Sequence, residues 1–424
     1  MMKTDVLVIG GGAAGAMAAT TAARSGFDTT LVRQGYGATA LSTGAVDLSE
    51  VAEWLRGIVT NAEMIHPTVD TVVADFLGLM AEANYAYVGS QDKDLILINA
   101  MGTVKSTHLV PETMAAGDLE SIEGARLLFV GVQGYPDFDA TYLSKSLRFL
   151  SDCGLVRTCF ETASLEIEFP RVVHTANLSS FELAQLMDDE EVVLEMAKCV
   201  QEKADLNQYT HLALPPILGR DNSARALAIL QDQTALCCFE VLSLPPSVPG
   251  FRMQRALDRA MKHRDVRIIH ASVESFSESK GGIRSVRVVE KETEYVLDPG
   301  VVILASGKFI GGGIQRTDRL REPIFDLPVF VDSDCAPDAE MGTLLAERFV
   351  SEQRIFKAGL QVDERFHPVS PDGQVIYSNL LAAGAVLAGY DYSLGQGGLG
   401  VSMVSGHLCA QVALDQLGGK GVFV

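Results

Sequence analysis

Six consecutive small residues near the start of the chain are the first whose types and spacing point to a definite chemistry. The run G-G-G-A-A-G contains the pattern G-x-G-x-x-G at Gly10, Gly12 and Gly15. The first glycine allows a tight turn, the second lets the backbone approach a phosphate, and the third lets helix and strand pack closely. A glycine-rich turn without a ligand is the alternative. Because an apolar run precedes the loop and a helix-competent run follows it, we predict a phosphate-bearing cofactor at Gly10, Gly12, Ala14 and Gly15.

Arg33, at the end of the next apolar run, helps to decide which nucleotide this loop binds. Dinucleotide sites usually place an acidic residue about twenty positions after the glycines, where it accepts the ribose hydroxyls. Here the run is Leu31-Val32-Arg33-Gln34, with Arg33 in that place. Arg33 could pair with a phosphate, or it could be a solvated charge at a strand end, and the sequence favours neither interpretation. The adenosine half of FAD thus lacks its usual anchor, and a mononucleotide is a live alternative.

Two short turns have the small and hydroxyl-bearing residues that suit close contact with a flavin. Ser42, Thr43 and Gly44 follow a glycine-rich loop, although serine and threonine also form such turns without a ligand. Ser306 and Gly307 end a β-branched apolar run, as in flavoproteins whose strand passes the cofactor. We predict both turns as parts of the cofactor site.

A glycine cluster near the C-terminus completes the set of flavin-like segments. Gly384 ends another apolar run, and Gly397 and Gly398 precede a run rich in serine, glycine and alanine that is expected to be a helix over 401–417. The dipole of such a helix can stabilise the negative charge that a reduced flavin carries at N1 and C2=O. Close packing of a helix on a sheet is the alternative reason for these small residues.

These segments must be positioned by strands and helices, and the sequence predicts them in a recognisable order. A strand over 5–9, a helix over 13–25 and a strand over 29–32 form a βαβ unit. Strand patterns return from 266 to 305 and again at 380–383. We therefore predict an α/β fold with a Rossmann-like flavin-binding domain made of 1–50, 264–310 and 375–424, and an inserted second α/β domain made of 51–263 and 311–374.

Composition limits the classes of function. The 424 residues include 34 Lys and Arg and 54 Asp and Glu, and 34 − 54 gives a net charge of −20 without any basic run, which excludes nucleic acid as a partner. Seven scattered cysteines form no C-x-x-C ligand set, so we expect reduced thiols and no metal site on this chain. No apolar run is long enough to span a bilayer, and we expect a cytoplasmic protein.

Taken together, these motifs resemble those of the B subunit of anaerobic glycerol-3-phosphate dehydrogenases, a family within the fumarate reductase-like flavoproteins. The resemblance covers most of the chain, in the family's order. It rests on L-S-T-G-A-V-D-L at 41–48, L-P-P-S-V-P-G-F-R-M-Q at 244–254, A-S-G at 305–307, G-G-G at 311–313, L-R-E-P-I at 320–324, S-N-L at 378–380, G-Y-D at 389–391 and G-Q-G-G at 395–398.

The resemblance implies a function and partners. It implies FMN as cofactor, with FAD as the alternative, and oxidation of sn-glycerol 3-phosphate to dihydroxyacetone phosphate. Electrons would go to a quinone pool, with fumarate or nitrate as terminal acceptor. It also implies an FAD-containing dehydrogenase subunit and an iron–sulfur subunit that holds the assembly at the inner face of the cell membrane. A stand-alone fumarate reductase-like oxidoreductase acting on a small acid and a cofactor-free scaffold subunit are the alternatives.

Three polar residues are the candidates for contact with the substrate. Oxidising an alcohol needs a base for the hydroxyl proton, and binding a phosphate needs cations. Arg252 follows a proline-rich turn, Arg321 follows a glycine-rich one, and His367 lies in R-F-H-P. We predict these three as catalytic residues, with surface ion pairs as the alternative for the arginines and an exposed loop position as the alternative for His367.

Overall fold

The chain folds into two compact units, both of the predicted α/β class. Unit 1 comprises Met1–Thr39, Val46–Leu79 and Ala256–Val424, and unit 2 comprises Ala40–Ala45 and Met80–Arg255. The structure, a computed structural model, describes residues 1–157, 160–172, 177–332, 334–335, 340–348, 351–389, 391–392 and 397–418. Among these residues, no helix is both long enough and apolar enough to cross a membrane.

A seven-stranded sheet forms the core of unit 1, in the order β11-β2-β1-β14-β13-β12, with β19 also paired to β14. Its strands are β1 Met2–Ile9, β2 Thr29–Arg33, β11 Arg267–His270, β12 Ser272–Ser279, β13 Gly282–Glu290, β14 Thr293–Leu304 and β19 Leu380–Ala382. Strands β11, β2, β1, β14 and β19 pair in parallel, whereas β12, β13 and β14 pair antiparallel. The carboxyl ends of β1, β14 and β19 therefore share one edge, where an open α/β sheet binds its ligands.

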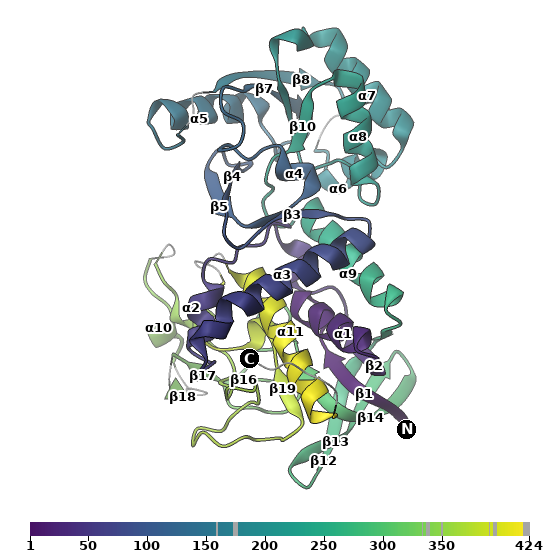
Figure 1. The fold of residues 1–424 in the computed structure, drawn as a ribbon, viewed down its shortest axis with the longest axis vertical. Coiled ribbons are helices and arrows are strands. Elements are labelled where there is room, and N and C mark those ends of the chain that lie inside the picture. The colour runs from purple at the N-terminus through teal and green to yellow at the C-terminus, as the bar shows by residue number, and fades with distance from the viewer. Residues whose placement is uncertain are drawn as a thin grey trace. The chain divides into compact units, whose positions relative to one another are not determined.

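Two helices built from small residues pack against each other beside this sheet. They are α1, Ala13–Arg24, and α11, Gly398–Gln416, drawn in purple and yellow in Figure 1. A side chain at Gly406 of α11 would overlap the carbonyl oxygen of Ala14, so the two helix backbones approach closely. Helices α2, Val51–Arg56, and α3, Ile65–Glu82, also begin in unit 1.

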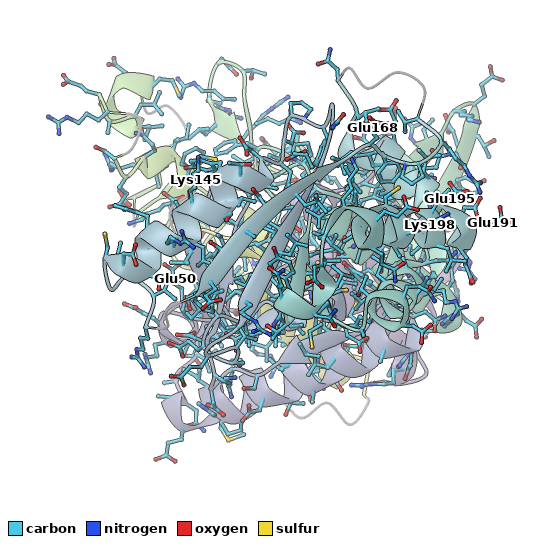
Figure 2. The ribbon with its side chains drawn as sticks, turned by 90° about the horizontal axis from the view of Figure 1, so that it is seen from above. Glu50, Lys145, Glu168, Glu191, Glu195 and Lys198 are labelled. Carbon is cyan, nitrogen blue, oxygen red and sulfur yellow. The ribbon has the colours of Figure 1, made fainter. Side chains whose placement is uncertain are left out.

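Unit 2 contains a second parallel sheet, in the order β10-β9-β7-β8. Its strands are β7 Arg126–Val132, β8 Glu161–Ile167, β9 His211–Leu214 and β10 Cys237–Glu240, and its helices include α4 Glu112–Ala115, α5 Ala140–Asp152, α6 Ser180–Leu186, α7 Glu190–Lys203 and α8 Ser223–Thr234. Figure 2 shows Glu191, Glu195 and Lys198 on the outer side of α7, while Val192, Val193 and Met196 are buried on its inner side. This alternation is the amphipathic pattern of a helix that covers a sheet.

Two antiparallel strand pairs complete unit 2, and small elements complete unit 1. β3 Tyr87–Gly89 pairs with β6 Leu109–Pro111, and the hairpin of β4 Leu95–Ile98 and β5 Val104–Thr107 lies between them in sequence. The small elements are β15 Gln315–Arg316, β16 Leu320–Arg321, β17 Phe330–Val331, β18 Asp334–Cys335, α10 Met341–Leu344 and the 3₁₀ turns η4 Arg354–Lys357 and η5 Gly384–Val386. Helix α9, Val248–His263, begins in unit 2 and continues into unit 1.

The units are divided differently from the predicted domains. Residues 51–79 and 311–374, which the sequence pattern placed in the second domain, belong to unit 1. Main-chain hydrogen bonds explain why residues 311–374 belong to unit 1. Leu360 N–H donates to Val386 O, and Ala382 N–H of β19 donates to Phe366 O. These are long-range pairings, for which local sequence patterns carry no signal.

Candidate functional site

The glycine loop at the end of β1 has the geometry of a phosphate cradle. Gly10 has a φ of 115°, and a side chain there would overlap the carbonyl oxygen of Ala305 at the end of β14. A side chain at Gly15 would overlap the carbonyl oxygen of Gly10. At Gly12 an added Cβ would meet only Thr39 Oγ1, at 3.2 Å. The first and third glycines are thus required by packing, and the second keeps the approach to the helix open.

The start of α1 supplies the donors of this cradle. Gly12 is the N-cap and provides no side-chain hydrogen bond, while Ala13 N–H donates to Thr39 Oγ1 at 2.9 Å. The other first-turn amides of a helix have no partner within the helix, and with the helix dipole they attract an anion. Thr39 was not predicted as part of the site. Its only sequence signal is its place just before the turn that contains Ser42 and Thr43.

Arg33 is not the solvated charge at a strand end that the sequence allowed, and its pairing with a phosphate stays a prediction. It is buried, and Nη1 and Nη2 donate to the carboxylate of Asp258 on α9 at 2.6 and 2.8 Å. Its side chain lies under the glycine loop, because a Cβ on Gly11 would stand 2.5 Å from Arg33 Cδ. The guanidinium also lies over the ring of Tyr36, 5.3 Å from the centroid. The charge of Arg33 is thus balanced inside unit 1 by a carboxylate and is not turned to solvent.

The end of β14 lies against the glycine loop and carries a buried hydroxyl. Ala305 N–H donates to Ile9 O at 2.8 Å, which fixes the turn beside the end of β1. Ser306 Oγ is buried and has no hydrogen-bond partner, and Gly307 has a φ of 76°. An unsatisfied hydroxyl at a strand end is what a bound polar ligand would satisfy. This orphaned atom and the open approach at Gly12 fit a bound flavin nucleotide.

The predicted C-terminal glycines also reach this edge of the sheet. Gly384 has a φ of 76°, and a Cβ there would stand 2.6 Å from Ala14 Cβ on α1. Ser405 of α11, which the sequence reading missed, accepts the Gly384 N–H with its Oγ at 2.9 Å. Gly397 is the N-cap of α11, so Gly397 and Gly398 lie where that helix begins. Gly395 and Gln396 of the same motif lie outside the described residues.

Charged residues surround the start of α11. Asp47 and Asp391 are buried, and the pKa of Glu50 is raised by burial and by the nearby Asp47, Glu53 and Asp391 carboxylates. A Cβ on Gly397 would lie 3.4 Å from Glu50 Cβ. Burial lowers the pKa of Lys308 to about 7, although Asp391 acts in the opposite direction. Neither Lys308 nor this acidic group was predicted, because burial of a charged side chain leaves no local sequence pattern.

Ser42, Thr43 and Gly44 form a hydroxyl turn that is held within unit 2. Ser42 Oγ accepts the Gly44 N–H and Thr43 Oγ1 accepts the Ala45 N–H, both at 3.3 Å. Ser247 Oγ donates to Ser42 O at 2.6 Å. Serine and threonine form such hydrogen bonds with or without a ligand, and a cofactor contact at these three residues stays a prediction.

Arg252 has the environment of a structural residue and not of a catalytic one. Only 2% of its surface is exposed, and Nη1 and Nη2 donate to Glu240 at 2.6 and 2.9 Å. Nε donates to Gly219 O at 2.6 Å. Glu240 also accepts the hydroxyl of Thr113 at 2.6 Å. The guanidinium is committed to holding unit 2 together, which corrects the expectation that it faces a substrate phosphate.

His367 is fixed far from the start of α11. Its Nδ1 lies 3.0 Å from Asp363 Oδ2, and Gln416 Nε2 lies 2.8 Å from its Nε2. Since an amide nitrogen can only donate, Nε2 accepts from Gln416 and Nδ1–H donates to Asp363. Gln416 is the last residue of α11, roughly 27 Å along the helix from Gly398. His367 thus lies at the opposite end of α11 from Gly398, and its catalytic role stays a prediction.

Arg321 remains an exposed residue of β16. The predicted alternative was a surface ion pair of Arg321 with Glu322 or Asp326, and neither pair is found among the described residues. Asp326 pairs with Arg319, and Glu322 is buried and accepts the main-chain N–H groups of Ile324 and Phe325 at 2.8 and 2.7 Å. Burial raises the pKa of Glu322 to about 6 against the effect of those N–H groups. The catalytic role of Arg321 stays a prediction.

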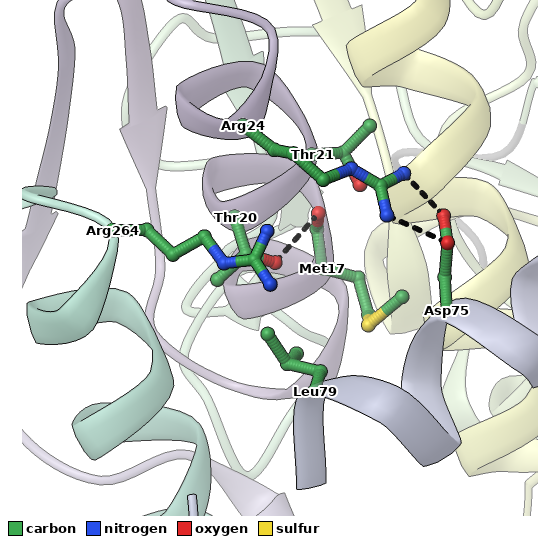
Figure 3. A pocket seen from close by; sticks show the side chains of 7 residues that line it. All are labelled: Met17, Thr20, Thr21, Arg24, Asp75, Leu79 and Arg264. Carbon is green, nitrogen blue, oxygen red and sulfur yellow. Dashed lines mark hydrogen bonds and ion pairs between the residues drawn. The ribbon is translucent and has the colours of Figure 1, made fainter. Parts of the chain in front are cut away.

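A small cavity in unit 1 is separate from this cradle. It has a volume of about 10 Å³, room for about one water molecule. Figure 3 shows its lining, with Arg24 donating to both carboxylate oxygens of Asp75. It is lined by Met17, Thr20, Thr21, Arg24, Asp75, Leu79 and Arg264. Elsewhere in the described part of the chain, no cluster of three or more His, Cys, Asp or Glu side chains could hold a metal ion.

The fold and the cradle define a flavin-binding protein of the oxidoreductase type, and comparison with known proteins agrees. The chain matches the FAD-binding domain family over residues 5–401 and belongs to that family. It is 28% identical to the B subunit of a probable anaerobic glycerol-3-phosphate dehydrogenase of Halobacterium salinarum strain R1, over 98% of this chain and 99% of the relative. The B subunit of the anaerobic glycerol-3-phosphate dehydrogenase of Vibrio vulnificus strain CMCP6 is 26% identical, over 98% and 97%. These relatives confirm the predicted resemblance.

A solved structure is similar over the whole length but only distantly. The 3-ketosteroid Δ1-dehydrogenase of Sterolibacterium denitrificans is 12% identical, with a TM-score of 0.45, over 98% of this chain and 100% of that one.

Proposed function

We propose that this chain is the flavoprotein B subunit of an anaerobic glycerol-3-phosphate dehydrogenase. The observation that carries the proposal is the full-length similarity to proteins of that name, together with a cradle whose geometry fits a flavin nucleotide. The reaction would be oxidation of sn-glycerol 3-phosphate to dihydroxyacetone phosphate. Electrons would pass to a quinone pool, with fumarate or nitrate as terminal acceptor.

The bound flavin would supply the acceptor for a hydride from the alcohol carbon. The residues of this chain would hold and orient it. Gly12, Ala14 and the first turn of α1 would bind its phosphate, Ser306 Oγ would gain a polar partner, and the start of α11 would face the ring.

We further propose FAD as the nucleotide, in place of the expected FMN. The family to which the chain belongs is described as FAD-binding. The expectation of FMN came from the family resemblance and from Arg33 in the place of an acidic residue, and the guanidinium of Arg33 is paired with Asp258. The nucleotide released on denaturation, identified by chromatography and mass, distinguishes the two: FAD supports this assignment, and FMN contradicts it.

The partners in this proposal are an FAD-containing dehydrogenase subunit and an iron–sulfur subunit that holds the complex at the inner face of the cell membrane. The relatives are named as one subunit of an enzyme, which supports membership of a multi-subunit complex.

One experiment tests the role of the chain against its alternatives. The purified chain should be yellow, should oxidise little or no glycerol 3-phosphate with a quinone analogue, and should gain that activity when mixed with the two partner subunits. Full quinone-linked turnover by the chain alone would favour a stand-alone oxidoreductase. A colourless chain that still restores activity to its partners would favour a cofactor-free scaffold.

A further inference from the structure

A buried lysine lies at the edge of the sheet where the flavin ring is expected. Lys308 follows Ser306 and Gly307 at the end of β14, and only 2% of its surface is exposed. Its Nζ donates to the carbonyl oxygen of Phe356 at 2.5 Å. Lysine is rarely buried to this extent, because its charged form loses much hydration energy in a protein interior. The burial of Lys308 at this position therefore raises the question of which negative charge stabilises its ammonium.

One aromatic residue connects this lysine to the start of α11. Nζ of Lys308 lies 5.8 Å from the centroid of the Tyr392 ring. A Cβ on Gly398, the first residue of α11, would stand 3.3 Å from Tyr392 Cβ. The Lys308 ammonium and the positive end of the α11 dipole thus lie near the same region of unit 1. Both would stabilise a negative charge placed there.

Burial and the nearby Asp391 carboxylate act on the Lys308 ammonium in opposite directions. Asp391 stabilises the protonated lysine, yet burial outweighs it and the pKa of Lys308 is lowered to about 7. Glu50 and Lys357 also interact with Asp391, and Tyr392 faces the lysine with its ring. A further negative charge next to Lys308 would stabilise its protonated form.

We propose that Lys308 is a charge-tuning residue for the flavin: its ammonium, together with the start of α11, stabilises the negative charge of the reduced ring and so favours flavin reduction. A flavin that has accepted a hydride, which is two electrons and one proton, carries one negative charge more than the oxidised form. Charge close to the ring is one of the means by which a protein sets flavin reactivity. The proposal rests on the proposed function only in requiring a flavin in this cradle.

The test is an equilibrium redox titration of the purified flavoprotein against a reference dye at pH 7, for the unaltered chain, Lys308→Met, Lys308→Gln and Lys308→Arg. Flavin content is measured first, so that an empty cradle, which contradicts the proposed function, is not mistaken for failure of this proposal. Met and Gln remove the charge, and the ratio of reduced to oxidised flavin at a fixed potential should fall roughly tenfold or more. Lys308→Arg keeps the charge, so its ratio of reduced to oxidised flavin should stay within about threefold of that of the unaltered chain.

Lys357→Met is the matched control. Lys357 precedes Ala358 at the end of η4, near the same Asp391, but it is partly exposed and pairs with Glu352. Its loss should change the ratio less than about twofold, because solvent screens its charge. Lys308→Met should fold, because burying an uncharged methionine carries no cost of removing a charge from water. Lys308→Gln is a second uncharged variant. Normal flavin content with an unchanged ratio in Lys308→Met and Lys308→Gln would overturn the proposal.

Discussion

Arg33 and Asp258 are 225 residues apart in sequence and form a two-bond ion pair beneath the glycine loop, with N–O distances of 2.6 and 2.8 Å. The pair joins the end of β2 to α9, so the position that normally accepts a ribose is occupied by a guanidinium that is itself bound by a carboxylate. Their side chains are 5% and 13% exposed, which makes the pair costly to break from one side.

The first prediction concerns this pair. Arg33→Met and Asp258→Asn should each lower the free energy of unfolding by about 2–4 kcal/mol, because each leaves one buried charge without its partner. The double variant should lose less than the sum of the two. Denaturant unfolding of all four proteins measures this coupling, and additive losses would show that the pair contributes little.

A second prediction follows from the open approach at Gly12. Gly12→Val should fold but contain little or no flavin, since an added Cβ meets only Thr39 Oγ1 within 4 Å and the side chain would occupy the place of the phosphate. Absorbance of the purified protein in the visible flavin band measures the cofactor. Gly35→Ala is the control, because a Cβ at Gly35 meets nothing within 4 Å and flavin content should be unchanged. A full complement of flavin in Gly12→Val would place the cofactor elsewhere.

The pH dependence of stability tests the burial of Lys308. Its pKa is about 7 in the fold, against 10.5 for an unperturbed lysine, so between these values the unfolded chain binds more protons than the folded one. Stability contributed by this group therefore rises with pH across that window. Relative to Lys308→Met, the unaltered chain should gain about 3 kcal/mol between about pH 7 and about pH 9.5. Parallel unfolding curves for the two proteins at both pH values would mean that Lys308 titrates as an exposed lysine.

Arg252 provides a prediction about unit 2. Arg252→Met should destabilise the protein by about 3–5 kcal/mol, because Glu240 would remain buried without its counter-charge. Flavin content should not change in the folded fraction, as the residue has a structural role. Arg255→Met on the same helix is the control: Arg255 pairs with Asp221 at the surface, and its loss should cost less than about 1 kcal/mol. Equal stability of the two variants would count against the structural role of Arg252.

Local patterns in the sequence determined the elements and much of the cradle. The strand over 5–9, the helix from Ala13 and the glycines between them are short-range features, and they fold as predicted because turn geometry and helix starts depend on adjacent residues. The strand patterns predicted from 266 to 305 are four strands, β11 to β14.

Only the tertiary structure decided the partners of the charged residues. Nothing in the run L-V-R-Q predicts that Arg33 meets Asp258, and nothing near Arg252 shows that Glu240 binds it from the end of β10. His367 was predicted as a catalytic residue, with an exposed loop position as the alternative, yet it is buried and contacts Asp363 and Gln416 at the far end of α11. The sequence by itself determined the strand–glycine–helix cradle, because its geometry is local. The roles of the charged side chains depend on burial and on partners up to 225 positions away, which exist only once the chain has folded.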